Sequence, residues 1–273
     1  MEKEFVIHLQ ALTMREWNER DKDHFPFTLD IIKSIQEIRF TAPVTFFVGE
    51  NGSGKSTVME SIACAAESIT VGSESVKTDK TLAEVRRLSQ YIRLSWSKRT
   101  RRGFFLRAED FFGYAKSMRQ AQEDLRRDAA QVERDYAGRS KLAADLARLP
   151  YQRELYDMQR RYGEGIDQRS HGESFMTLFQ SRFAPGGLYL LDEPEAALSP
   201  SRQLTFLAAL KQMIEQEAQF IIATHSPILL AFPQADILLF EGGEIKRVKY
   251  EDLEHVQLTR DFLKKPDLFL KYL

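Results

Sequence analysis

The sequence predicts an α/β fold built around a parallel β-sheet. A short apolar run at residues 44–48 is followed at once by glycines and then by apolar residues at helical spacing, which indicates a strand, a loop and a helix in that order. Two more apolar runs, at residues 188–191 and 220–223, flank a helical pattern at residues 201–217. Strands and helices that alternate in this way are typical of parallel sheets.

Weaker patterns predict the remaining elements. Strands are expected at residues 5–9 and 35–40, where apolar residues alternate loosely. Residues 91–96 and 104–106 are interpreted as two strands joined by the turn SKRTRRG. The composition of residues 115–162, rich in Ala, Arg, Gln, Glu, Asp and Leu, favours two or three helices with solvated faces. The tail from residue 258 is expected to form short helices.

Composition places the chain among globular proteins. Its 273 residues suit one large domain or two small ones, and 43% of them are hydrophobic, which is enough for a sizeable core. We find no apolar run of the roughly 18 residues that a membrane span requires, and no signal-peptide pattern. The single cysteine, Cys64, excludes an intrachain disulfide. A cytoplasmic location without a membrane partner is therefore expected.

The net charge of −1 conceals a basic segment at residues 86–107, which carries eight basic side chains and no acidic one. At its centre, four side chains could contact nucleic-acid phosphates, with Trp96 and Phe104 nearby for stacking. Equally, the segment could be a solvated turn, or could pair with acidic residues of this chain or of a partner protein. The four basic side chains are those of Lys98, Arg99, Arg101 and Arg102.

The stretch GENGSGKST at residues 49–57 matches the phosphate-binding loop pattern G-x-x-x-x-G-K-S. Glycines let backbone N–H groups turn toward phosphate oxygens, and the helix that follows presents its positive end to the same anion. Lys55 is expected to reach the β- and γ-phosphates, and the Ser56 hydroxyl to bind Mg²⁺. The alternative is an ordinary glycine-rich turn. The expected phosphate contacts are Gly49, Glu50, Asn51, Gly52, Ser53, Gly54, Lys55, Ser56 and Thr57.

Two further stretches carry the chemistry of hydrolysis. In LYLLDEP, at residues 188–194, Asp192 ends an apolar strand and could hold Mg²⁺, while Glu193 could orient a water molecule for attack on the γ-phosphate. In IIATHSP, His225 follows another apolar run, at the edge of the sheet where ligands bind in such folds. We expect it to contact the γ-phosphate. The alternatives are a buried strand with an acidic turn and a structural histidine.

The order GENGSGKST, LYLLDEP, ATHSP resembles the Walker A, Walker B and switch-histidine elements of ABC-type P-loop ATPases. The resemblance covers roughly residues 5–245 and is closest to the heads of SMC and repair ATPases and to small stand-alone prokaryotic ATPases. It implies one domain over residues 1–273, with a mixed sheet and a short helical insertion at about residues 113–168. It also implies that ATP and Mg²⁺ are bound and that a homodimer closes head to tail when ATP binds.

The family's signature, LSGGQ or LSGGE, is represented by RSHGE at residues 169–173. Ser170, Gly172 and Glu173 match the signature, and His171 stands where glycine is usual. The resemblance implies that this helix start binds the γ-phosphate held by a second copy. Ser170 followed by Glu173 is also a capping box, so an ordinary capped helix is the alternative.

Two other family elements are less regular. Ser199 stands where the D-loop normally has aspartate, and we see no glutamine at the expected Q-loop position. Glu109, beside Arg107, could replace it as a metal ligand; Gln90 is a weaker candidate, and all three could be surface residues.

Three uses of ATP hydrolysis remain open. They are a DNA-linked motor or clamp in repair or defence, an ATP-gated regulator of a partner nuclease or toxin, and the engine of a transporter. The irregular signature and missing glutamine disfavour the third.

Overall fold

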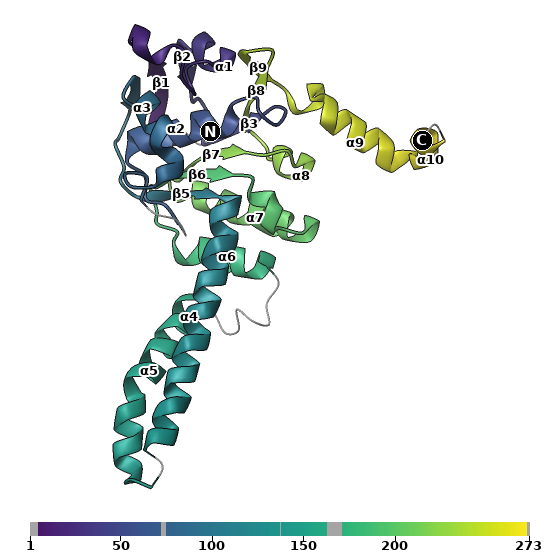
Figure 1. Cartoon of the computed structure of the whole chain (residues 1–273). Helices are drawn as coiled ribbons and strands as arrows, with labels where there is room; N and C mark the ends of the chain where they lie inside the picture. The colour runs from purple at the N-terminus through teal and green to yellow at the C-terminus, as the bar shows by residue number, and fades with distance from the viewer. Residues whose placement is uncertain (1–4, 72–74, 137, 163–170, 272–273) are drawn as a thin grey trace.

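The computed structural model describes residues 5–71, 75–136, 138–162 and 171–271. Two sheets form the body, and two helical arms project from it in different directions (Figure 1). The larger sheet has the strand order β5-β6-β7-β3-β8-β9, and the smaller has the order β2-β1-β4.

The larger sheet is mixed, as predicted. Its first five strands are parallel, and only β9 at the edge is antiparallel. All residues of the three central strands β6, β7 and β3 are buried, which explains why each is a short, nearly continuous apolar run. The strands are β5 (Gly103–Arg107), β6 (Leu188–Asp192), β7 (Gln219–Ala223), β3 (Val44–Val48), β8 (Asp236–Glu241) and β9 (Glu244–Val248).

The smaller sheet is antiparallel and consists of β2 (Glu37–Arg39), β1 (Leu9–Met14) and β4 (Ile92–Trp96). It corrects two predictions. β4 pairs with β1 whereas β5 pairs with β6, so residues 97–102 cross between the sheets and are not a hairpin turn. The first strand begins at Leu9 and not at residue 5, and the ring of the preceding His8 lies 2.7 Å from the backbone oxygen of Glu217.

Helices cover both faces of the larger sheet and divide the core into two clusters. One cluster joins the sheet to α6 (His171–Ser181), α7 (Pro200–Ile214) and α8 (Pro227–Leu230). The other joins it to α1 (Asp30–Ser34), α2 (Lys55–Ala66), α3 (Ala83–Ser89) and the smaller sheet. Short 3₁₀ turns occur at Glu19–Asp21, Lys80–Leu82, Pro194–Ala197 and Tyr250–Asp252.

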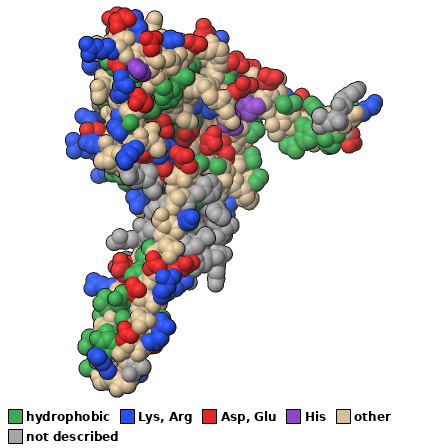
Figure 2. All heavy atoms as spheres, in the orientation of Figure 1, with side chains coloured by type: hydrophobic (Ala, Val, Ile, Leu, Met, Phe, Trp, Pro, Cys, Tyr) green, Lys and Arg blue, Asp and Glu red, His purple; other side chains and the backbone are tan. Residues whose placement is uncertain are grey.

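Two helices, α4 (Ala108–Asp135) and α5 (Lys141–Tyr162), form the longer arm and match the expected helical segment. The Arg148 guanidinium and the Glu133 carboxylate join them at 3.0 Å. Figure 2 shows apolar side chains along this arm, and four of them on α5 are more than half exposed. They are Leu142, Leu146, Leu149 and Tyr156.

The shorter arm is the C-terminal pair α9 (Glu254–Lys264) and α10 (Pro266–Leu270), which confirms the predicted short helices. The rings of Phe262 and Phe269 pack edge to face across the two helices at 5.7 Å. None of the helices in the described part of the chain is both long and apolar enough to cross a bilayer.

Candidate nucleotide site

The glycine loop leaves β3 and turns directly into α2. Gly49, Gly52 and Gly54 have φ angles of +150°, +82° and +93°, in the region that glycine adopts readily. A Cβ atom on Gly49 would lie 2.3 Å from the Phe240 carbonyl oxygen, and one on Gly54 would lie 2.5 Å from Ile31 Cγ2. Both packing and backbone angle therefore require glycine at these two positions.

Lys55 lies inside the loop and is 5% exposed. Its ammonium group donates hydrogen bonds to the carbonyl oxygens of Gly49 (2.7 Å) and Glu50 (2.9 Å). Burial lowers the pKa of Lys55, and the nearby carboxylates of Asp192, Glu193 and Glu195 oppose this shift. The lysine is therefore held at the loop with the acidic end of β6 close by.

Asp192 is the last residue of β6 and is buried. Its carboxylate accepts a hydrogen bond from the Ser56 side chain, while Oδ1 is buried without a partner among the described residues. Burial raises the pKa of Asp192 to about 6, and the hydrogen bond from Ser56 opposes this shift. A hydroxyl beside a carboxylate with an unused oxygen is a ligand set that suits Mg²⁺.

Glu193 adopts a left-handed conformation, with φ 49° and ψ 51°. Its N–H donates to the carbonyl oxygen of Ala223 on β7 (2.9 Å), which fixes the turn against the neighbouring strand. A non-glycine residue in this region is strained by about 1–3 kcal/mol, and such strain is found most often at functional sites. The strained turn therefore fixes the backbone of Glu193, the residue that directly follows Asp192.

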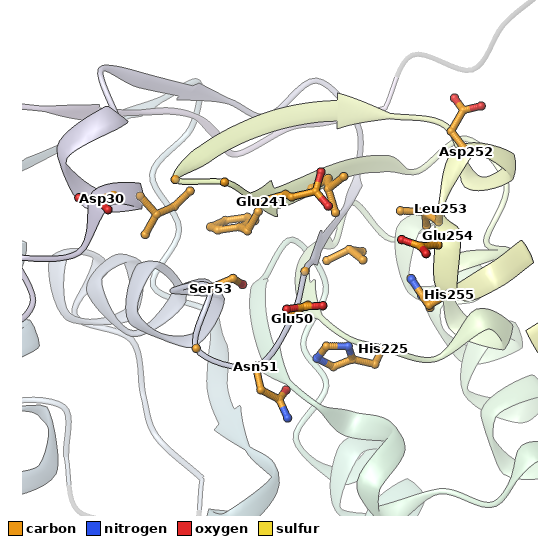
Figure 3. A pocket seen from close by; sticks show the side chains of 18 of the residues that line it. Asp30, Glu50, Asn51, Ser53, His225, Glu241, Asp252, Leu253, Glu254 and His255 are labelled. Atoms are coloured by element: carbon orange, nitrogen blue, oxygen red, sulfur yellow. The ribbon is translucent and has the colours of Figure 1, made fainter. Parts of the chain in front are cut away.

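His225 follows β7 by two residues and lines a cavity of about 960 Å³. The glycine loop, from Gly49 to Ser53, lines the same cavity (Figure 3). The backbone N–H of His225 donates to Glu195 Oε1 at 2.7 Å, and its Nε2 is buried without a partner among the described residues. The structure therefore brings the predicted histidine and the predicted loop to one cavity.

The remaining predicted residues are those of the signature and the candidates for the Q-loop. Ser170 lies outside the described residues, while Gly172 and Glu173 belong to the first turn of α6. The Glu109 side chain is 74% exposed and lies 3.3 Å from the Arg107 guanidinium. Gln90 is an exposed residue at the end of α3.

Arg107, at the expected Q-loop position, is buried opposite Asp192 in the β5–β6 register. Its guanidinium donates two hydrogen bonds to the Asp110 carboxylate, at 2.7 and 3.0 Å, and one to Asp79 at 3.0 Å. Glu60 of α2 lies 3.6 Å from the same guanidinium. Burial raises the pKa of Glu60 to about 7, although the charge of Arg107 opposes this shift.

Three residues of the site region were not predicted from the sequence. Glu195 is the third carboxylate of DEPE, and its place three residues after Asp192 was an available signal. Glu60 and His255 carried no such signal, because tertiary packing alone brings Arg107 to Glu60 and α9 to the cavity.

The four cationic side chains of the basic segment are exposed. Its two aromatic neighbours differ in how far burial leaves them accessible for stacking. Phe104 is 3% exposed and packs against Phe179 and Tyr189, so the expectation that it stacks on bases is wrong. Trp96 is partly buried. Arg102 donates to the carbonyl oxygen of Pro185 at 3.1 Å, which anchors the crossing segment to the turn before β6.

A glycine loop between strand and helix, a buried lysine and a carboxylate at the end of a parallel strand together define a P-loop nucleoside triphosphatase fold. A model of the family described as "AAA domain" matches residues 29–182, more than half of the chain, and the chain belongs to that family. A second model, described as "AAA domain, putative AbiEii toxin, Type IV TA system", matches residues 174–231. The predicted class, an ABC-type P-loop ATPase, is confirmed.

Similar solved structures include the Smc head domain of Pyrococcus furiosus, with an extended coiled coil and bound to the C-terminal domain of ScpA. It is 12% identical, and the match covers 94% of this chain and 100% of that chain with a TM-score of 0.46. A nucleotide-free ATP-binding cassette from an ABC transporter is 13% identical, with 98% and 99% covered and a TM-score of 0.46. Clostridium perfringens cbiO1, part of the ABC transporter complex cbiONQ, is 15% identical, with 99% and 100% covered and a TM-score of 0.46. Comparison with curated proteins finds no match.

Proposed function

We propose that this chain binds ATP with Mg²⁺ at the loop of residues 49–57 and hydrolyses it. The observation that carries the proposal is the buried Asp192 carboxylate, which is bound to Ser56 and keeps one oxygen without a partner among the described residues. Leaving a buried carboxylate oxygen unpaired is costly, so a bound cation at this point would satisfy it. Lys55 lies close enough to Asp192 to interact with its charge.

Each side chain has a separate task in this proposal. Ser56 and Asp192 would hold Mg²⁺, which when bound neutralises phosphate charge. Lys55 exchanges its carbonyl partners for phosphate oxygens, and Glu193 orients the attacking water. His225 contacts the γ-phosphate, and its unpaired Nε2 is the atom available for that contact.

The second part of the proposal is a head-to-tail homodimer that closes on ATP. Ser170, Gly172 and Glu173 of one copy would then contact the nucleotide held by the other. The position of Gly172 and Glu173 in the first turn of α6 supports this, because the N-terminus of a helix favours an anion. Hydrolysis would reopen the dimer.

An ATPase assay of Asp192→Asn, with oligomeric state measured in parallel, tests the proposal. The amide removes the charge that holds Mg²⁺, so Mg²⁺-dependent turnover should fall by about 100-fold or more. Exposed Asp128→Asn is a matched control and should behave as the wild type. Wild-type protein without ATPase activity, or a fully active Asp192→Asn variant, would contradict it.

Two biological uses are supported by different observations. The exposed basic side chains at residues 98–102 support a DNA-linked role in maintenance or defence. The toxin description of the family that matches residues 174–231 supports the alternative, an ATP-gated regulator of a partner effector. DNA-stimulated ATPase activity that is lost in Arg99→Ala/Arg101→Ala and in high salt would favour the first role. Co-purification of a second protein without nucleic acid would favour the second.

A further inference from the structure

The C-terminal helix α9 contributes a histidine to the wall of the candidate nucleotide cavity. His255 lies in the first turn of α9, and it lines the cavity together with His225 and the glycine loop. Figure 3 shows the two histidines on the same side of the cavity, with Asp30 and Ser53 on the other side. A segment almost two hundred residues from the loop in sequence is thus part of the same site.

The ring nitrogens of the two histidines share an unusual property. Nε2 of His225 and Nε2 of His255 are both buried, and neither has a hydrogen-bond partner among the described residues. Most buried polar atoms are paired, so an unpaired ring nitrogen indicates a missing partner. Burial lowers the pKa of His255, and the nearby His225 lowers it further, which agrees with the two rings lying close together.

The side chains around the cavity limit which groups there can donate to an anionic ligand. Among the described residues that line the cavity, five carry carboxylates and none is lysine or arginine. These carboxylates can only accept hydrogen bonds when ionised, whereas a neutral histidine ring carries an N–H that can donate to a phosphate oxygen of a nucleotide held at the glycine loop. The five carboxylates are those of Asp30, Glu50, Glu241, Asp252 and Glu254.

We propose that His255 is a nucleotide-binding residue that donates from Nε2 to the terminal phosphate, beside His225. This inference rests on the proposed binding of ATP at the glycine loop. The hydrogen bond from His255 makes the first turn of α9 sensitive to whether the nucleotide ends in a γ-phosphate. It thereby links the C-terminal arm to the nucleotide state.

The test compares binding of adenylyl imidodiphosphate, a non-hydrolysable ATP analogue, with binding of ADP by titration calorimetry on the full chain. Three variants distinguish the contributions of the two ring nitrogens of His255. His255→Ala removes both nitrogens, His255→Gln places an amide nitrogen near the position of Nε2, and His255→Asn places one near Nδ1. His24→Ala is the control, because His24 is an exposed histidine that does not line the cavity.

We expect His255→Ala and His255→Asn to weaken binding of the triphosphate analogue about tenfold or more, the loss typical of one hydrogen bond to a charged group. Binding of ADP should change less than about twofold, and His255→Gln should retain most of the affinity. Unchanged analogue binding in His255→Ala, or an equal loss for both nucleotides, would overturn the inference. Wild-type protein that binds neither nucleotide would refute the proposed function itself.

Hydrogen exchange of residues 254–271 supplies a second readout that does not depend on affinity. With saturating analogue, exchange at the start of α9 should slow in the wild type and in His255→Gln, but not in His255→Ala. Equal protection in all three proteins would also overturn the inference. Circular dichroism of each variant without nucleotide checks that α9 remains folded.

Discussion

The Glu195 carboxylate accepts a hydrogen bond from the backbone N–H of His225 at 2.7 Å. Glu195 belongs to the turn after β6, which begins with the strained Glu193, and His225 belongs to the segment after β7. One carboxylate therefore ties together the two segments that we propose act at the γ-phosphate. Its other oxygen, Oε2, is buried without a partner among the described residues.

Replacing Glu195 should loosen that connection. Glu195→Ala leaves the His225 N–H without its acceptor, which costs about 1–3 kcal/mol of folding free energy, and should lower kcat about tenfold because His225 is less well positioned. Glu195→Gln keeps an oxygen acceptor and should retain most of the stability and turnover. Urea unfolding and steady-state kinetics measure both effects, with exposed Glu215→Ala as control. Wild-type stability and kcat in Glu195→Ala would show that the hydrogen bond has no functional role.

Glu193→Gln should separate binding from hydrolysis. The amide cannot accept a proton from the attacking water, so turnover should fall by about 10²–10⁴-fold while ATP affinity stays unchanged. The variant should then accumulate an ATP-dependent dimer, measurable by light scattering. If it hydrolyses ATP like the wild type, Glu193 is not the residue that orients the water.

Glu60 predicts a pH dependence of stability. Burial raises its pKa from 4.5 to about 7, so between these values the folded state binds more protons than the unfolded state. The free energy of unfolding should therefore fall as pH rises from about 4.5 to 7, by up to about 3 kcal/mol from this residue. Glu60→Gln should flatten this slope in urea unfolding at several pH values, whereas exposed Glu123→Gln should not. An unchanged slope in Glu60→Gln would assign the pH dependence to other groups.

The glycines of the loop should differ in their tolerance of alanine. A Cβ atom on Gly49 would lie 2.3 Å from a backbone oxygen, whereas one on Gly52 would have no atom within 4 Å. Gly49→Ala should therefore destabilise the fold by about 3 kcal/mol, and Gly52→Ala by about 1 kcal/mol from its positive φ alone. Urea unfolding of both variants checks this order. Equal losses would mean that backbone angle matters here and the close contact does not.

Local patterns were sufficient for the elements nearest the candidate site. The strands at residues 44–48, 188–191 and 220–223 were predicted because each is buried on both faces and therefore reads as a nearly continuous apolar run. The turn at residues 97–102 was assigned wrongly to a hairpin, since strand pairing depends on residues far away in the chain. The strand pair β8–β9 was not predicted at all.

The sequence by itself determined the glycine loop, the carboxylates at the end of β6 and the histidine after β7, because each is specified by residues within a few positions of one another. Only the tertiary structure decided that Arg107 would contact Asp79 and Glu60, and that His255 would line the cavity with His225. The physical reason is that such contacts arise when α2, α9 and the segment at Asp79 pack around one edge of the sheet. The sequence separation between these segments carries no information about their distance in space.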